Sequence, residues 1–248
     1  MKAFLLAAGL GTRLRPITYT VPKCLVPVAG KPMLAYWFDL FRKHGITDVL
    51  INLNHLPDLV RRFVCENDHD IRVTLVYEET LLGSLGTILE NKFYVEGEES
   101  FFIFYADTLT NVNLGEMLIN HKSSGKPFTM GLFHTDNPNS CGIAELDCNN
   151  TIVGFEEKPQ NPKSTLANAG LYIMNTSLLN DIYRSQGKLL DIGYDLLPTL
   201  VCNMNGYKNI NFVLDIGTQA NLTRANEFIK MNPGIFMQGY NVDPSEIL

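Results

Sequence analysis

The chain has no long hydrophobic run. Its first apolar stretch, at 3–8 ("AFLLAA"), is far too short for a signal peptide or a membrane span. No later run approaches the roughly 18 residues that a spanning helix needs. The sequence also has no repeat, low-complexity tract or block of like charge. With 46% hydrophobic and 19% charged residues, these absences predict a globular, cytoplasmic protein without a membrane partner.

Cysteine pairs are also absent. The five cysteines are scattered and form no CxxC motif, which excludes a disulfide framework or a zinc knuckle. They are Cys24, Cys65, Cys141, Cys148 and Cys202. We expect reduced, mostly buried thiols. The five histidines lie outside any recognisable acid–base constellation, so none is expected to be catalytic.

Acidic residues are missing from the first 38 residues, although the chain has a formal net charge of −6. The same segment carries five cations: Lys2, Arg13, Arg15, Lys23 and Lys31. An acidic protein is a poor candidate for general nucleic-acid binding, so no nucleic-acid partner is expected. A local positive patch on an acidic body indicates a small anionic ligand instead.

Apolar, β-branched runs alternate with helical patterns through the first half of the chain. Strands are predicted at 3–8, 48–53, 71–77, 100–107 and 128–134, and helices at 33–44, 57–66, 84–92 and 113–122. Strands separated by helices of this length form βαβ units. The pattern predicts an α/β, Rossmann-like fold with a mixed, mainly parallel sheet flanked by helices.

The pattern changes after residue 137. Short strand-like runs separated by turn residues ("GIAELD", "TIVGFEEKP", "ANAGLYIMN") predict a small antiparallel lobe within the same domain. A helix at 192–202, a strand at 210–214 and a last helix at 218–231 follow, and the tail from 232 is predicted to be irregular coil.

A glycine-rich loop follows the first strand. It is not a dinucleotide fingerprint, because Leu14 stands where GxGxxG needs its third glycine. The later Gly30-Lys31 pair is not a P-loop, because Pro32 supplies no hydroxyl for magnesium. Backbone N–H groups at such glycines attract phosphate, and Arg13 and Lys23 add a planar fork and a point charge. The loop is therefore expected to hold a polyphosphate.

The stretch "LAAGLGTRLRPIT…VPKCLVPVAGKPML" resembles the signature of the sugar-1-phosphate nucleotidyltransferases, also called NDP-sugar pyrophosphorylases. The similarity continues through "YEETLLGSLGT", "FFIFYAD", "CGIAELD", "FEEKP", "NAGLYIMN" and "LDIGT", and covers about residues 1–230. It implies the nucleotide-diphospho-sugar transferase fold. It also implies an enzyme that condenses an NTP with a sugar 1-phosphate to give an NDP-sugar and pyrophosphate, with Mg²⁺ as cofactor. The sequence itself does not indicate an oligomeric state, but the family is commonly oligomeric, which is compatible with a homodimer.

The resemblance also assigns roles within a single catalytic domain, 1–248. Residues 1–136 would mainly bind nucleotide, 137–231 would mainly bind sugar phosphate and metal, and 232–248 would form a tail. The expected nucleotide contacts are Leu6, Ala8, Gly9, Gly11, Thr12, Arg13, Glu79, Gly83, Gly86 and Thr87. The expected sugar-phosphate contacts are Gly142, Glu157, Lys158, Asn168 and Gly170.

The reacting centre is expected to consist of Lys23, Arg13 and Asp107, with Asp107 and Asp215 as the magnesium ligands. Both aspartates follow apolar strands, and Mg²⁺ is held by one or two carboxylates plus phosphate oxygens. Two positions depart from the family pattern: Cys24 replaces a proline, and Leu85 stands where many relatives carry alanine.

The substrate pair stays open. GTP with a mannose-type or heptose 1-phosphate is favoured. A uridylyltransferase acting on N-acetyl sugar 1-phosphates and a cytidylyltransferase are the alternatives. A glycosyltransferase would be expected to carry a DxD motif at the end of the strand predicted at 100–107, but the sequence there is "ADTLT", with a single acidic residue. A non-catalytic nucleotide-sensing subunit would be expected to lack Lys23, Asp107 or Asp215, and all three are present.

Overall fold

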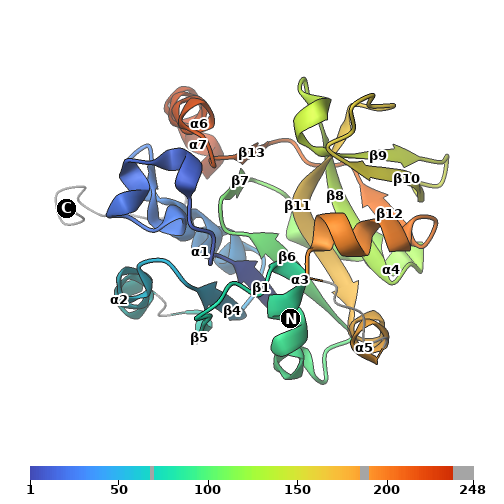
Figure 1. The fold of residues 1–248 in the computed structure, drawn as a ribbon, viewed down its shortest axis with the longest axis horizontal. Coiled ribbons are helices and arrows are strands. Elements are labelled where there is room, and N and C mark those ends of the chain that lie inside the picture. Colours follow the sequence, from blue (N-terminus) through green and yellow to red (C-terminus); the bar gives the residue numbers. More distant parts are fainter. Residues whose placement is uncertain (68–69, 185–189, 237–248) are drawn as a thin grey trace. The chain divides into compact units, whose positions relative to one another are not determined.

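A computed structural model describes residues 1–67, 70–184 and 190–236. Figure 1 shows the ribbon of these residues. The contacts within the chain divide it into two compact units. Of the described residues, unit 1 comprises those within Met1–Phe4, Thr80–Phe104 and Val112–Asn211, and unit 2 comprises those within Leu5–Glu79, Tyr105–Asn111 and 212–236. Each unit is built from segments that are distant in sequence, so the residues of a site need not be neighbours along the chain.

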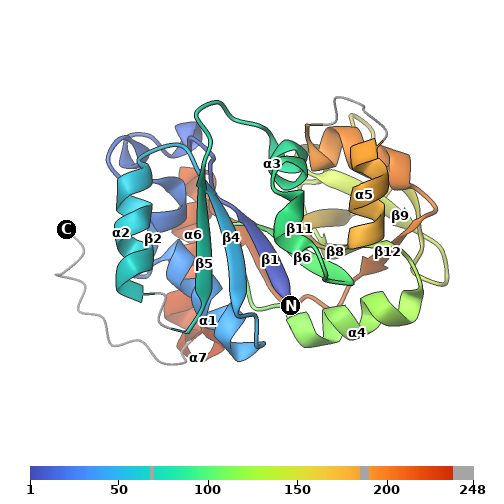
Figure 2. The same ribbon diagram turned by 90° about the horizontal axis from the view of Figure 1, so that it is seen from below.

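Unit 2 contains a parallel sheet. The strands β4 (Asp48–Leu53) and β5 (Arg72–Tyr77) pair in parallel, and α2 (Pro57–Asn67) connects them (Figure 2). The strand β1 (Lys2–Leu6), whose residues are divided between the two units, precedes β4 in the strand order. The helix α2 begins at a proline, which suits the first helical position because its missing N–H would be unpaired there.

The helix α1 (Met33–Lys43) supplies much of the core of unit 2. Eight of its 11 residues are buried, including Trp37 and Phe41. It ends before Gly45, whose φ of 66° is the left-handed conformation common after a helix. The short strands β2 (Pro27–Val28) and β3 (Lys31–Pro32) form a hairpin before this helix.

A two-stranded antiparallel sheet in unit 2 joins distant parts of the chain. It pairs β7 (Thr108–Thr110) with β13 (Val213–Asp215), and Asp215 lies opposite Thr108. After β13 comes α6 (Gln219–Met231), whose first turn is capped by Thr218 accepting from the N–H of Asn221 at 3.2 Å. The register of this small sheet brings Asp215 next to the residue that precedes β7.

Unit 1 is centred on the long strand β11 (Leu166–Asn175). It pairs antiparallel with β6 (Ser100–Tyr105) and with β8 (Phe128–His134). The hairpin of β9 (Gly142–Leu146) and β10 (Ile152–Glu157) continues from β11, and β12 (Met204–Tyr207) pairs in parallel with β8 (Figure 1). The helices α3 (Ser84–Glu90), α4 (Leu114–Ser124) and α5 (Thr176–Arg184) complete the unit.

The fold class predicted from the sequence is confirmed: a mixed, mainly parallel sheet with flanking helices and small antiparallel sheets. The predicted strands at 48–53 and 128–134 match β4 and β8, and the predicted helix at 33–44 matches α1 within one residue. None of the helices in the described ranges is both long and apolar enough to cross a membrane.

Four predictions about secondary structure and burial were wrong. The stretch 192–202 is a π-helical turn, Ile192–Leu196, followed by a 3₁₀ turn, Leu197–Leu200, because Pro198 lacks the N–H that a continuing α-helix needs. The strand expected at 210–214 lies at Val213–Asp215. The tail forms a short helix, α7 (Pro233–Phe236), and its remainder lies outside the described residues. Of the five free cysteines, Cys24 is buried, Cys141 is half-buried and the other three are exposed.

Candidate functional site

The glycine loop after β1 is fixed by hydrogen bonds within unit 2. The N–H of Ala7 donates to Oδ1 of Asn52 at 2.7 Å, and Nδ2 of Asn52 donates to Oε1 of Glu78 at 2.8 Å. Gly11 adopts a φ of 64°, and a Cβ there would lie 2.8 Å from the Thr18 side chain. The loop therefore requires glycine at 11, and its start is anchored to the neighbouring strand β4.

The predicted nucleotide contacts at the end of β1 differ in exposure. Leu6 and Ala8 are buried, so they can contact a ligand mainly through their backbone. Gly9, Thr12 and Arg13 are exposed. This segment thus offers backbone groups and one guanidinium, which is the combination that suits phosphate oxygens.

Lys23 is the charged centre of unit 2. It begins the 3₁₀ turn Lys23–Leu25, and its ammonium group is bonded to the carboxylate of Asp107. Its Nζ also lies 3.7 Å from Oδ1 of Asp215. The backbone closes the same cluster, because the N–H of Ile216 donates to the carbonyl of Asp107 at 2.9 Å. Three residues that the sequence predicted for the reacting centre are therefore brought together.

The cluster holds two carboxylates beside one ammonium group. The pKa of Asp215 is raised, because its carboxyl is partly removed from water and lies beside the negative Asp107. Lys23, the N–H of Gly217 and Arg13 act in the opposite direction but do not cancel these effects. Two carboxylates this close together form a donor pair that can hold a cation, although the described residues contain no group of three or more metal-ligating side chains. This donor set fits Mg²⁺, which takes its remaining ligands from water and phosphate.

Gly217 leaves room for these charges. A Cβ at this position would lie 2.7 Å from Oδ1 of Asp215 and 2.8 Å from Nζ of Lys23. Its N–H donates to the same Oδ1 at 2.6 Å. Glycine at 217 is thus required by close approach of the ionic groups, which explains the "LDIGT" pattern around Asp215.

Cys24 occupies the position where the family pattern has proline. Its side chain is 1% exposed, and burial raises the pKa of its thiol to about 12. The thiol therefore stays neutral and unreactive at physiological pH. Cys24 acts as a small apolar side chain behind Lys23 and adds no charge to the cluster.

The cations of the opening segment do not all serve one site. Lys31 is bonded to Asp39 of α1, and its ammonium lies 4.7 Å from the ring centroid of Tyr36. Arg15 lies over the ring of Tyr19 at 5.1 Å. Of the five cations, Lys23 and Arg13 are the two whose charges act on Asp215.

In unit 1, the predicted nucleotide contacts Gly83, Gly86 and Thr87 lie at the start of α3. The N–H groups of Leu85 and Gly86 both donate to the carbonyl of Leu190, at 2.9 and 3.2 Å. Thr87 is buried and its hydroxyl donates to the carbonyl of Gly83 at 3.0 Å. Gly83 has a φ of 80°, and a Cβ there would collide with the Leu190 carbonyl. This segment is therefore bound to the turn at 190–195.

The predicted base contact Glu79 is exposed in unit 2. Its neighbour Glu78 is 5% exposed and belongs to the network that holds the glycine loop through Asn52. The carboxylate that bears on the loop geometry is thus the residue before the predicted one. The sequence "YEET" places two glutamates in succession, and strand alternation alone left open which one points inward.

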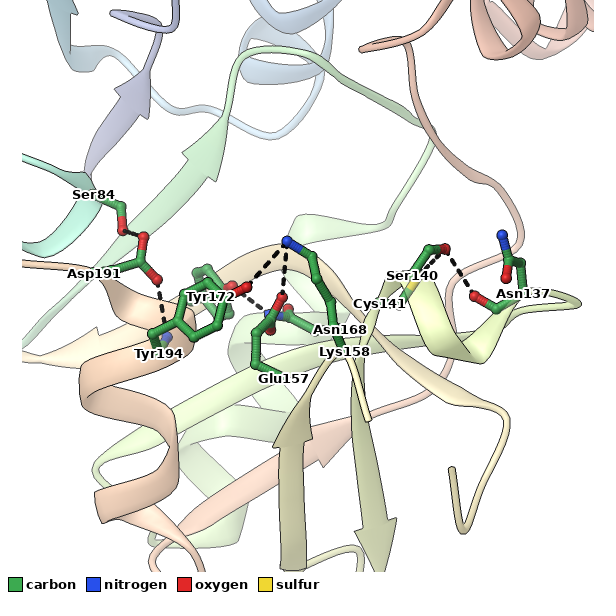
Figure 3. Close-up of polar contacts among 10 residues, drawn as sticks. All are labelled: Ser84, Asn137, Ser140, Cys141, Glu157, Lys158, Asn168, Tyr172, Asp191 and Tyr194. Carbon is green, nitrogen blue, oxygen red and sulfur yellow. Dashed lines mark hydrogen bonds and ion pairs between the residues drawn. The ribbon is translucent and has the colours of Figure 1, made fainter. Parts of the chain in front are cut away.

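A second cluster, in unit 1, gathers predicted sugar-phosphate contacts at the end of β10 (Figure 3). Nζ of Lys158 donates to the hydroxyl of Tyr194 at 3.2 Å and lies 4.0 Å from Oε1 of Glu157. Burial raises the pKa of Glu157, and nearby Asp191 adds to the rise while Lys158 opposes it. The cluster therefore presents a carboxylate, an ammonium group and a phenol.

Two glycines surround the Glu157 carboxylate. A Cβ at Gly142 would collide with Oε2 of Glu157, and one at Gly193 would lie 3.2 Å from the same oxygen. Gly142 also lies opposite Glu157 in the β9–β10 pairing. The predicted contacts Gly142, Glu157 and Lys158 are thus neighbours in space.

The remaining predicted sugar contacts lie on β11. Nδ2 of Asn168 donates to the hydroxyl of Tyr172 at 2.7 Å, and the N–H of Gly170 donates to Oδ1 of Asn168 at 2.9 Å. Gly170 has a φ of 68°, at a break in the pairing of β11 with β8. Asn168 therefore has an orientation fixed by its own strand.

Sequence reasoning missed three polar residues of unit 1: Ser84, Asp191 and Tyr194. They lie in "GSLG" and "DIGYD", and the second stretch was predicted to begin a helix. Aspartate directly before a helical turn is a recognised capping pattern, so Asp191 could have been identified as a cap. The contact of Tyr194 with Lys158 depends on tertiary packing and had no sequence signal.

Comparison with known proteins supplies the family. The sequence model described as nucleotidyl transferase matches residues 2–232. The chain belongs to the nucleotidyl transferase family. This confirms the resemblance to sugar-1-phosphate nucleotidyltransferases that the opening motif indicated.

Curated relatives in this family act on different nucleotides. Mannose-1-phosphate guanylyltransferase 1 of Arabidopsis thaliana is 32% identical over 224 residues, which are 88% of this chain and 61% of the relative. A UTP–glucose-1-phosphate uridylyltransferase of Synechocystis is 30% identical over 219 residues, 81% of this chain and 55% of the relative. The chain thus spans between 55% and 61% of the length of these two nucleotidyl transferases.

Solved structures of the family share the fold. A Bacillus anthracis protein described as a glucose-1-phosphate thymidylyltransferase, crystallised with sucrose, has a TM-score of 0.82 at 23% identity and covers 99% of both chains. HddC from Yersinia pseudotuberculosis, complexed with GMP-PN, has a TM-score of 0.77 at 22% identity, covering 92% of this chain and 99% of HddC. At these identities the likeness supports the fold alone.

Proposed function

We propose that this nucleotidyl transferase condenses an NTP with a sugar 1-phosphate, giving an NDP-sugar and pyrophosphate. The observation that carries the proposal is the Lys23 cluster. The Lys23 side chain, which is 12% exposed, lies against Asp107 and near Asp215 beside a glycine loop suited to phosphate. The family match at 2–232 supports the same reaction class.

The reaction requires no nucleophilic side chain. An oxygen of the sugar phosphate forms a bond to the α-phosphorus of the NTP, and the bond to the bridging oxygen of pyrophosphate breaks. The attacking group is already an anion, so no general base is needed. Catalysis of this kind depends on positioning two repelling anions and on neutralising the charge that develops during transfer.

Residues of this chain can meet both needs. The exposed backbone and guanidinium of the loop at 9–13 would bind the triphosphate, and Lys23 would neutralise charge at the α-phosphoryl group. Lys158 and Glu157 would hold the phosphate and hydroxyl groups of the sugar phosphate. We thus assign Lys23 to the NTP and Lys158 to the sugar 1-phosphate.

Mg²⁺ would be held by Asp107 and Asp215. The support is the pair of carboxylates beside Lys23, which suffices for a magnesium ion that also binds phosphate oxygens. The ion would add positive charge to the phosphoryl groups. Lys23 keeps the two carboxylates in place.

We propose GTP with a mannose-type or heptose 1-phosphate as the preferred substrate pair. The support is the guanylyltransferase relative of Arabidopsis thaliana and the GMP-PN complex of HddC. The uridylyltransferase relative of Synechocystis and the thymidylyltransferase-like structure of Bacillus anthracis favour a second candidate, a pyrimidine nucleotide with glucose 1-phosphate.

The test is a matrix of GTP, UTP, dTTP and CTP against mannose, heptose, glucose and N-acetylglucosamine 1-phosphates, read by pyrophosphate release. The GTP pairs with mannose or heptose 1-phosphate should give the highest rates. Highest rates with UTP or dTTP would select the second candidate. No release with any pair would overturn nucleotidyl transfer and favour a nucleotide-sensing subunit.

A further inference from the structure

Tyr194 contacts the lysine that the proposed function assigns to the sugar phosphate. Its hydroxyl accepts from Nζ of Lys158 at 3.2 Å, and the ammonium lies 5.5 Å from the centroid of its ring (Figure 3). Both side chains are more than half exposed, at 58% for Tyr194 and 53% for Lys158. An exposed lysine side chain usually samples many rotamers, so this contact restricts a group that would otherwise be mobile.

The backbone of Lys158 is also constrained. It has a φ of 51°, a left-handed conformation that is uncommon for residues other than glycine. Its N–H donates to the carbonyl of Cys141 at 3.0 Å, which holds the residue in this conformation. Strained backbone of this kind is typical of residues whose side-chain position matters for function.

The turn that carries Tyr194 is held by side-chain hydrogen bonds. Oδ1 of Asp191 accepts from the N–H of Tyr194 at 2.9 Å, and Oδ2 of Asp191 accepts from the Ser84 hydroxyl at 3.1 Å. The Ser84 oxygen also accepts from the N–H of Ile192 at 2.8 Å. Tyr194 is therefore placed by a capped turn that is attached to the start of α3.

An ammonium group has three donors, so Lys158 can serve a phosphate oxygen while it contacts Tyr194 and Glu157. The phenol oxygen accepts from one of these donors and leaves the others free for the phosphate. We infer that Tyr194 is a positioning residue for the sugar 1-phosphate, which directs the Lys158 ammonium toward the phosphate. This inference rests on the proposed function.

The direct test compares Tyr194→Phe with wild type in steady-state kinetics. Loss of the hydroxyl should raise KM for the sugar 1-phosphate by about tenfold or more, the scale of one hydrogen bond to a charged group. KM for the NTP and the melting temperature should stay unchanged. Tyr194→Leu, which also removes the ring, should raise KM for the sugar 1-phosphate further.

Tyr183→Phe is the matched control. Tyr183 in α5 is 51% exposed, and Nζ of Lys92 lies 4.3 Å from its ring centroid. It thus has similar exposure and a similar neighbouring cation, but it lies outside the Glu157–Lys158 cluster. Its kinetics should equal those of wild type.

A double-mutant cycle with Lys158→Ala separates positioning from a structural role. If Tyr194 acts through Lys158, the effect of Tyr194→Phe on KM should disappear in the Lys158→Ala background. An unchanged KM in Tyr194→Phe, or an effect that persists undiminished without Lys158, would overturn the inference while leaving the proposed function intact. Absence of activity in the wild type with every substrate pair would overturn both.

Discussion

The ammonium group of Lys23 is bonded to the carboxylate of Asp107, 84 residues later in the sequence. The pairing of β7 with β13 adds Asp215, whose Oδ1 lies 3.7 Å from the same ammonium. One cation thus neutralises part of the charge on two carboxylates. The proposed reaction uses this arrangement, because the carboxylates can hold a metal ion while the lysine binds a phosphate oxygen of the NTP.

Lys23→Ala should lower kcat about 10²- to 10³-fold, because it removes a fixed positive charge from the developing phosphoryl charge. Steady-state pyrophosphate release measures the rate, and circular dichroism checks the fold. Lys31→Ala is the matched control, because Lys31 is also a partly buried lysine bonded to an aspartate, Asp39, within unit 2. Near-normal turnover of Lys23→Ala would contradict the role given to Lys23.

Asp107→Asn and Asp215→Asn should each raise the Mg²⁺ concentration needed for half-maximal activity. The expected change is about tenfold or more, the range seen when groups that support a metal are removed. A magnesium titration of the initial rate measures it, with Asp39→Asn as the control outside the cluster. If both variants keep the wild-type titration curve, the metal is bound by other residues.

Gly217→Ala should lower kcat about tenfold without unfolding the protein, because the new methyl group would push against the Asp215 carboxylate and the Lys23 ammonium. Gly234→Ala is the control, because a Cβ there meets no atom within 4 Å. Rates and melting temperatures of both variants distinguish the two effects. Equal rates for the two variants would show that the close approach at Gly217 has no catalytic consequence.

The raised pKa of Glu157 leads us to expect that activity and stability depend on pH. Its raised pKa means that the carboxylate is protonated at a higher pH than an ordinary glutamate, so kcat/KM for the sugar phosphate should fall as pH decreases toward this pKa. The folded protein binds this proton more tightly than the unfolded chain, so the contribution of Glu157 to stability becomes less favourable as pH rises.

Glu157→Gln should therefore remove the acid limb of the pH profile and lower activity at neutral pH, while the melting temperature stays equal or rises. Glu156→Gln, at the exposed neighbouring position, should keep the wild-type profile. A profile of kcat/KM and a thermal melt across about pH 5 to 8 measure both effects. An acid limb that survives in Glu157→Gln would assign it to another group.

Much of the fold could be predicted from local pattern. The runs that became β4 and β8 are continuous apolar segments bounded by turn residues, and α1 combines an apolar face with a glycine after its end. The pairing of distant strands could not be predicted in this way. The antiparallel strand β11 pairs with both β6 and β8, so the latter two, predicted as successive strands of βαβ units, are separated by a segment from later in the chain.

The candidate site divides in the same way. Lys23, Asp107 and Asp215 were predicted because each lies in a motif that resembles the family signature. Tyr194 was not predicted as a site residue, because its contact with Lys158 depends on the π-helical turn that replaces the expected helix. The choice between Glu78 and Glu79 also depends on packing, since one hydrogen bond from Asn52 makes the first of them the buried carboxylate.

The most direct test of nucleotidyl transfer is ³¹P NMR of a reaction mixture with GTP, mannose 1-phosphate and Mg²⁺. The account predicts that the signals of an NDP-sugar and of pyrophosphate grow together in equal amounts. They should grow only when both substrates are present, and the Lys23→Ala variant should be slower by at least about 10²-fold. Consumption of GTP without sugar 1-phosphate, or no NDP-sugar from any NTP and sugar 1-phosphate pair, would contradict it.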